Sequence, residues 1–120
     1  MAVRGIRGAT RLSADDPAEM SEAVIDLLSA IIERNDLRHD DLVSILFTST
    51  PDLVSAFPAT SAREIGLADV PLLCAQEIDV DGALPRVIRI LVHAETELPR
   101  ARISHIYQRG AESLREDLAH

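Results

Sequence analysis

The sequence predicts an α+β fold in which about five strands form a mixed sheet packed against one long helix. Two observations carry this prediction: one stretch shows helical spacing of its apolar residues, and five other stretches are short apolar runs typical of strands. With 120 residues the chain has room for one core, so we expect a single domain over residues 1–120. An apolar fraction of 47% and a charged fraction of 27% are typical of a globular protein.

The helix is expected over about residues 17–35. Asp16 is typical of an N-cap, Pro17 suits the first helical position, and Glu19 completes a capping-box pattern, in which the cap and the third residue bond to each other's backbone. The apolar residues that follow at helical spacing are Met20, Val24, Leu27, Leu28 and Ile31. Asn35 and Asp36 end the helix, and its apolar side is expected to lie against a sheet.

Five stretches are predicted as strands: residues 2–7, 42–48, 70–77, 86–94 and 103–107. The first is short and interrupted by glycine, whereas the second is a continuous apolar run, as is expected of a strand buried on both faces. Residues 57–66 contain a proline and several small residues and are expected to form one or two turns of helix. One long helix covers only one face of the sheet, so we expect other copies of the chain to cover the opposite face.

The composition excludes several classes of function. There are 20 acidic residues against 12 basic ones, for a formal charge of −8, and aromatic residues make up 2%, so neither nucleic acid nor an anionic membrane surface is an expected partner. No apolar run approaches the ~20 residues of a membrane span and no signal peptide is evident, so a cytoplasmic protein is expected. Every basic residue is an arginine, which excludes Schiff-base lysine chemistry. The positive side-chain charges that remain are guanidinium groups, which bind carboxylates through paired hydrogen bonds.

The one cysteine, Cys74, rules out an intramolecular disulfide and a thiolate metal cluster. Its apolar neighbours favour burial as a small hydrophobic residue. The four histidines lack the spacing of metal ligands. We therefore expect no metal ion and no cofactor.

Blocks of sequence along nearly the whole chain resemble the trimeric, monofunctional chorismate mutases, the α/β-barrel class rather than the all-helical one. The blocks are RGIRGAT at 4–10, STPDL at 49–53, FPA at 57–59, ARE at 62–64, VPLLCAQEIDV at 70–80, IRI at 88–90, HIY at 105–107 and LREDL at 114–118. The resemblance implies subunits that assemble as a trimeric pseudo-α/β barrel, with active sites at the subunit interfaces. It also implies conversion of chorismate to prephenate in aromatic amino-acid biosynthesis.

That reaction suits a chain without lysine or metal-ligand motifs. Chorismate rearranges by an intramolecular [3,3] shift, in which a carbon–oxygen bond breaks while a carbon–carbon bond forms, so that no proton, nucleophile, metal or cofactor is required. Catalysis instead needs a folded substrate conformer and stabilisation of the negative charge that grows on the ether oxygen. The two carboxylates of the substrate also call for cations.

The resemblance assigns catalytic roles to Arg89, Arg7 and Glu77, and substrate-binding roles to Tyr107 and Cys74. Arg89 matches the arginine set against the ether oxygen, and Arg7 matches a carboxylate-binding arginine with Tyr107 beside it. Glu77 and Cys74 match residues near the ring hydroxyl and the positively polarised ring. A carboxylate at Glu77 would also offset the charge of nearby arginines.

The remaining substrate-binding positions follow from the same resemblance. The adjacent subunit is expected to supply Phe57 and Arg63, and the other positions are Ala59, Leu73, Leu114 and Arg115, the last two in a C-terminal segment that closes over the ligand. Two positions depart from the family: Leu73 stands where a threonine is frequent, and Thr60 where a lysine is. The second departure removes one cation near the entrance, so weaker substrate binding is expected.

The residues taken alone leave alternatives open. Alternation places Arg89 on one face with Leu91 and His93, either solvated on an edge strand or buried and awaiting an anion. Tyr107 suits a core position equally well, Arg7 suits a strand-end surface position, and Glu77 suits an exposed acidic run. Two other functions stay in consideration: a non-catalytic oligomeric module that senses a small carboxylate or amino acid, and a trimeric imine or enamine hydrolase.

Overall fold

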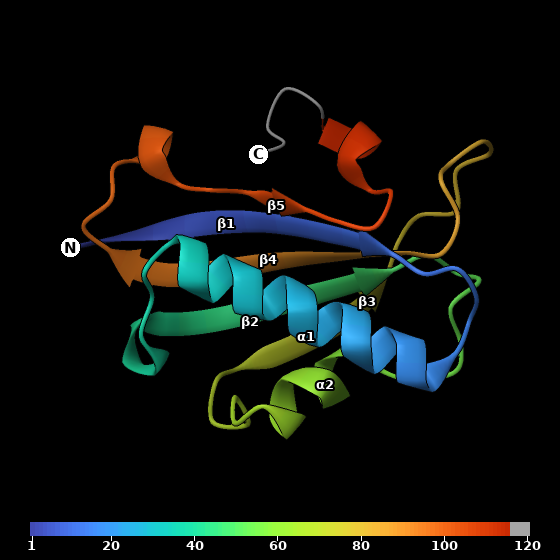
Figure 1. Cartoon of the computed structure of the whole chain (residues 1–120), viewed down its shortest axis with the longest axis horizontal. Helices are drawn as coiled ribbons and strands as arrows, with labels where there is room; N and C mark the ends of the chain where they lie inside the picture. The colour runs from blue at the N-terminus through green and yellow to red at the C-terminus, as the bar shows by residue number, and fades with distance from the viewer. Residues whose placement is uncertain (116–120) are drawn as a thin grey trace.

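Five strands form one mixed sheet with both helices on the same face of it (Figure 1). This computed structural model describes residues 1–115, with side chains through Leu114. The strands are β1 (Ala2–Arg11), β2 (Leu42–Ser49), β3 (Leu72–Gln76), β4 (Val87–Thr96) and β5 (Ile106–Tyr107), in the spatial order β3-β2-β4-β1-β5. β4 is antiparallel to β1 and β2, whereas β3 and β5 run parallel to their neighbours. The predicted fold class is confirmed.

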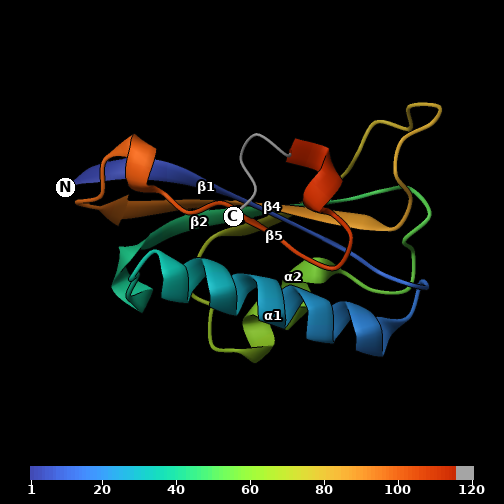
Figure 2. The same ribbon diagram turned by 45° about the horizontal axis from the view of Figure 1, so that its top comes forward.

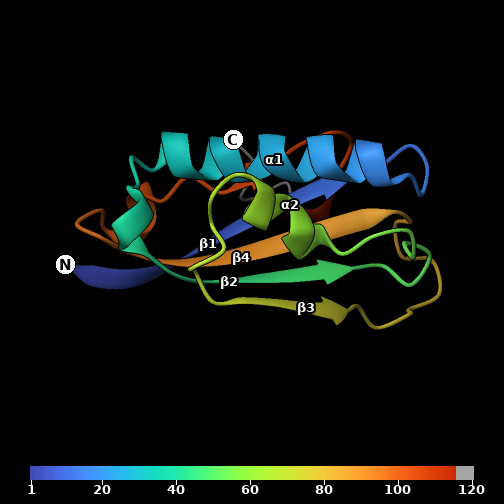
Figure 3. The same cartoon turned by 90° about the horizontal axis from the view of Figure 1, so that it is seen from below.

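The helices are α1 (Pro17–Arg34) and α2 (Pro58–Glu64), and short 3-10 turns occupy His39–Asp41, Arg100–Arg102 and Glu112–Arg115. Figure 3 shows α1 and α2 on one side of the strands and the other side of the sheet open. The loop between β3 and β4 extends past the ends of the strands (Figure 2). The described residues include no helix that is both long and apolar enough to cross a membrane.

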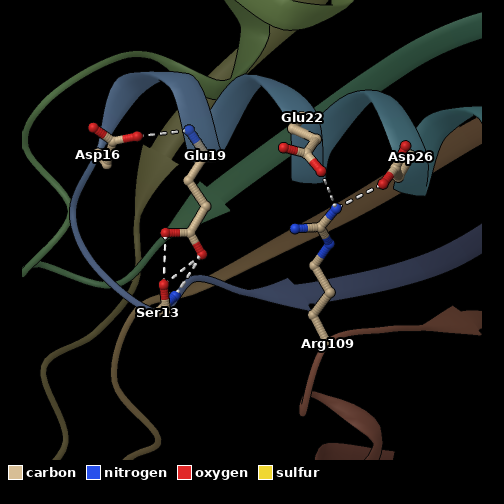
Figure 4. Close-up of polar contacts among 6 residues, drawn as sticks. All are labelled: Ser13, Asp16, Glu19, Glu22, Asp26 and Arg109. Carbon is tan, nitrogen blue, oxygen red and sulfur yellow. Dashed lines mark hydrogen bonds and ion pairs between the residues drawn. The ribbon is translucent and has the colours of Figure 1, made fainter.

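The start of α1 confirms the predicted cap but not the predicted partner of Glu19. The Asp16 carboxylate accepts a hydrogen bond from the Glu19 backbone N–H at 2.8 Å, as an N-cap does (Figure 4). The Glu19 carboxylate, however, accepts from Ser13, whose backbone N–H lies 2.6 Å away. The reason is that the Asp16 N–H already donates to the Ala14 carbonyl. The capping glutamate therefore fastens α1 to the chain just after β1.

β1 is longer than the sequence predicted, because all ten of its residues pair with β4. Gly5, the glycine inside the predicted range, does not interrupt the strand. Gly8 lets α1 approach closely: a Cβ at Gly8 would lie 2.7 Å from Ile31 Cδ1 and 3.2 Å from Leu27 Cδ1. The absence of a side chain at Gly8 thus sets the distance between the helix and the sheet.

Substituting Gly8 by alanine is expected to lower the free energy of unfolding by about 1–3 kcal/mol, because the added methyl group overlaps Ile31. Urea unfolding measures this change. The variant Ile31→Val removes the overlapping Cδ1 atom, so the double variant should lose less stability than the two single losses added together. Strict additivity would contradict the proposed overlap.

The run over β2 was predicted to be buried on both faces, but within one chain only one face is covered. Ile45 and Phe47 point toward the helices and are buried, whereas Ser44, Leu46 and Thr48 alternate with them and are partly exposed. The helices lie on one side only, so the other side of the sheet, here called the open face, keeps apolar side chains in contact with solvent. One of these side chains is Leu73 on β3, which is 61% exposed.

Candidate active site

A hollow of about 310 Å³ lies on the open face of the sheet, over β1, β2 and β4. Arg7, Arg89 and Tyr107, which are far apart in the sequence, all line it. The strand register brings them together: Ala9 pairs with Arg89 on one side and with Tyr107 on the other. Three residues that the family resemblance selected therefore share one cavity.

Arg89 lies on a central strand, so the edge-strand alternative is wrong. The second alternative, full burial, does not hold within one chain either, since 47% of the Arg89 side chain is exposed. The Nε atom of Arg89 lies 3.1 Å from Glu77 Oε2. Within residues 1–115 its two Nη groups have no hydrogen-bond partner, so they remain available to an anion in the hollow.

Glu77 does not belong to an exposed acidic run. Only 18% of its side chain is exposed, whereas Asp79 and Asp81 are in solvent. Its backbone N–H donates to the Ser49 carbonyl, and Thr48 Oγ1 donates to Glu77 Oε2 at 2.7 Å. Because Thr48 and Arg89 both hold the same carboxylate oxygen, the guanidinium is fixed in direction before any ligand arrives.

Arg7 on β1 and Tyr107 on β5 line the same hollow as Arg89. The Arg7 backbone N–H donates to His105 Nδ1 at 2.9 Å, and Tyr107 is buried except for a small fraction of its surface. Arg7 also lines a neighbouring hollow together with Arg4 and Arg100. Within the described residues none of these three arginines forms an ion pair. This end of the open face therefore carries uncompensated positive charge on a chain whose net charge is −8.

A second group of predicted residues lies elsewhere on the chain. Phe57, which is 70% exposed, and Cys74, which is half-buried against the core, line a different hollow between α2 and β3. Arg63 is exposed on α2, and its Nη2 donates to Thr60 Oγ1 at 3.2 Å. The threonine that departs from the family pattern thus orients Arg63. None of Phe57, Cys74 and Arg63 lines the Arg89 hollow of the same chain.

The remaining predicted residues differ in their surroundings. Ala59 is buried in the main core, whereas Leu73 is exposed on the open face opposite Leu46. Leu114 packs on the small apolar cluster formed by Ala9, Tyr107 and Ala111, next to the hollow. The side chain of Arg115 lies outside the described residues.

Sequence reasoning missed two residues that hold the site residues in place. Thr48, which positions Glu77, could have been noticed as a polar residue that alternates toward the open face. Asp15 gave no signal, because its partners lie about 40 positions away: its carboxylate accepts hydrogen bonds from the backbone N–H groups of Val54 and Ser55 at 3.1 and 3.2 Å. Asp15 thereby fixes the loop that carries Phe57.

The Phe57 loop is expected to loosen in acid, because hydrogen bonds from the Ser55 side chain and from the Val54 backbone lower the pKa of Asp15 below its usual value of 3.8. A lowered native pKa stabilises the fold above the unfolded-state pKa, and this contribution disappears as the pH falls through the native pKa. Amide NMR shifts of Val54 and Ser55 should therefore change below about pH 4. Asp15→Asn should abolish the change and Asp81→Asn, at an exposed position, should not; persistence in Asp15→Asn would contradict the assignment.

Comparisons with known proteins all lead to one family. Residues 3–118 match the family model for chorismate mutase type I. The chain is 47% identical over 117 residues to chorismate mutase AroH of Thermus thermophilus, covering 97% of this chain and 96% of the relative. It is 41% identical over 120 residues to chorismate mutase AroH of Bacillus subtilis, covering 99% of this chain and 94% of the relative.

The fold comparison leads to the same family. A solved chorismate mutase from Clostridium thermocellum superimposes with a TM-score of 0.90 at 41% identity, covering 92% of this chain and 98% of the solved one. These three relatives are named as enzymes, which favours catalysis over the sensing module considered above. The match of the family model to nearly every residue means that the chain belongs to the chorismate mutase type I family.

Proposed function

We infer that this protein is a chorismate mutase, an isomerase that converts chorismate to prephenate in aromatic amino-acid biosynthesis. The observation that carries the proposal is the Arg89 guanidinium, which Glu77 holds in the hollow of the open face with its Nη groups free of partners among the described residues. A rearrangement without proton transfer needs this kind of fixed cation rather than an acid, a base or a nucleophile.

Arg89 supplies the largest catalytic effect in this proposal. As the ether bond stretches, negative charge collects on its oxygen. An Nη group aimed at that atom therefore interacts more strongly with the transition state than with the ground state. The ion pair with Glu77 and the bond from Thr48 fix the direction of the guanidinium in advance, so that it need not reorganise during the reaction. Glu77 also places negative charge near the ring, where positive charge grows.

Arg7 and Tyr107 bind one of the two substrate carboxylates in this proposal. Both line the same hollow as Arg89, and the arginine-rich end next to it provides local positive charge. The net charge of −8 repels a dianion at long range, so binding depends on these short-range guanidinium contacts. Holding the two carboxylates selects the folded conformer in which the bond-forming carbon atoms approach each other.

We propose that the active form is a homotrimer whose sites lie between subunits. The open face of the sheet exposes apolar side chains, and among the described residues of one chain no exposed aromatic side chain like Phe57 lines the Arg89 hollow. A neighbouring subunit that brings its Phe57 and Arg63 over the hollow would add an apolar wall and a further cation. Cys74 lines the same hollow as Phe57, so we assign it to the neighbour's contribution as well. We place the reaction in the cytoplasm.

The direct test follows the ultraviolet absorbance of chorismate with purified protein. The proposal expects the diene signal to disappear as prephenate forms, without added metal or cofactor. Binding of chorismate without loss of the signal would support the sensing module instead. Failure of chorismate either to bind or to react would refute the proposed function.

A further inference from the structure

The turn that follows β5 places an arginine in the left-handed backbone conformation. Arg109 has a φ of +54° and Gly110 a φ of +90°. The chain therefore reverses through two left-handed residues shortly after β5. Arginine rarely adopts this conformation. Two residue pairs join β5 to β1, Gly8–Ile106 and Ala9–Tyr107. Within the turn, the Ala111 N–H donates to the Gln108 carbonyl at 3.0 Å and the Gly110 N–H donates to Glu112 Oε1 at 2.7 Å.

Two carboxylates of helix α1 bind the Arg109 side chain of this turn. Arg109 Nη2 lies 2.6 Å from Asp26 Oδ2 and 3.4 Å from Glu22 Oε1 (Figure 4). Glu22 and Asp26 are one helical turn apart, where like charges destabilise a helix, so a cation between them relieves their repulsion. The hydrogen bond to Asp26 raises the pKa of Arg109. The contact thus joins the middle of α1 to the chain two residues after Tyr107.

The turn that Arg109 holds is connected to the Arg89 hollow by apolar packing. Beyond the turn, Ala111 and Leu114 pack on Ala9 and Tyr107, and both of these line the Arg89 hollow. At the other end of β5, the buried Asn35 at the end of α1 accepts from the Ser104 backbone N–H at 2.8 Å and donates to its carbonyl at 3.0 Å. The chain is therefore held on both sides of β5: by Asn35 before the strand, and by Glu22 and Asp26 of α1 after it.

We propose that Arg109 is a positioning residue: its bridge to Glu22 and Asp26 of α1 holds the turn that keeps Tyr107 and Leu114 in place for substrate binding. The inference rests on the chorismate mutase activity proposed above. Sequence reasoning had given no role to Arg109, because its partners lie more than 80 positions earlier in the chain.

The size of the expected effect follows from exposure. The Glu22 and Asp26 side chains are 71% and 54% exposed, so solvent screens the pair and its loss leaves the global fold intact. An exposed pair of this kind corresponds to at most about a fivefold change in an equilibrium constant. We expect KM to rise about two- to fivefold while kcat changes by less than about twofold, since Arg109 does not line the Arg89 hollow.

Four variants test the bridge by steady-state kinetics. Arg109→Asn removes the charge but tolerates the left-handed backbone, and the double variant Glu22→Gln with Asp26→Asn removes the partners without touching the turn. Both should raise KM. Arg109→Lys, which keeps the charge, should largely preserve KM. Glu33→Gln, which neutralises an exposed carboxylate on the same helix, should leave it unchanged.

A second readout does not depend on turnover. Tyr107 is the single tyrosine of a chain without tryptophan, so intrinsic tyrosine fluorescence reports on this site alone. Without substrate, acrylamide should quench Tyr107 more strongly in the two bridge-breaking variants than in wild type, Arg109→Lys or Glu33→Gln. Unchanged quenching together with unchanged KM would overturn the proposal. A fall in kcat as large as the rise in KM, in Arg109→Asn and in the double variant, would overturn it as well. An inactive wild type with altered quenching in the variants would refute the proposed function and leave the bridge standing.

Discussion

Replacing Arg89 by alanine is expected to lower kcat by at least about a hundred- to a thousandfold. Removal of a single preorganised donor from a developing oxyanion has this effect in other enzymes, and Arg89 provides a full positive charge. The ionic groups near the hollow are not expected to compensate: Glu77 has the wrong sign, and the proposal assigns Arg7 to a substrate carboxylate. The measurement is kcat for chorismate at saturating substrate.

The fold of the Arg89→Ala variant should persist, since the side chain is nearly half exposed and its ion pair is partly screened. Circular dichroism, unfolding by urea and the oligomeric state are therefore expected to match wild type closely. Arg102→Ala, which removes an exposed arginine of a 3-10 turn, is the matched control and should keep full activity. A folded Arg89→Ala protein that retains a tenth or more of the wild-type kcat would refute the assigned role.

Local sequence signals predicted the main elements of the fold because those signals act over a few residues. The Asp16 cap with Pro17 and the apolar spacing of the following residues placed α1 within one residue of its observed end. The apolar runs likewise located every strand. For β1 the prediction failed because of a distant segment, since pairing with β4 along its whole length extends the strand. The predicted capping box failed for a local reason, because the Ala14 carbonyl accepts the Asp16 N–H that Glu19 was expected to bind.

The site was predictable to a different extent. The family resemblance selected Arg7, Arg89 and Tyr107, and the structure brings them into one hollow. Spacing alone left Arg89 undecided, because its environment depends on the strand order, which no local pattern encodes. Thr48, Asp15 and Arg109, which hold parts of the site in place, were not found, since each acts through partners far away in the sequence.

Dissociation of the assembly is expected to abolish activity, which is the second large effect. The Arg89 hollow of one chain lacks the Phe57 wall and the Arg63 cation, both of which lie on another part of the same chain. Activity per chain should therefore fall steeply when the protein is diluted below its assembly constant, and sedimentation should show monomers at the same concentration. Monomers with undiminished activity per chain would contradict a site built between subunits.

Mixing two inactive variants distinguishes loss of contributed residues from a general effect of dissociation. Arg89→Ala destroys the oxyanion contact of its own chain, and Arg63→Glu gives the neighbour's site a repelling charge. If each site combines Arg89 of one subunit with Arg63 of the next, random reassembly of equal amounts restores both arginines in about a quarter of the sites. Each variant dissociated and reassembled alone should gain nothing. If the mixture also gained nothing, both arginines would have to act within the same chain, and because they lie in separate parts of that chain the interface model would fail.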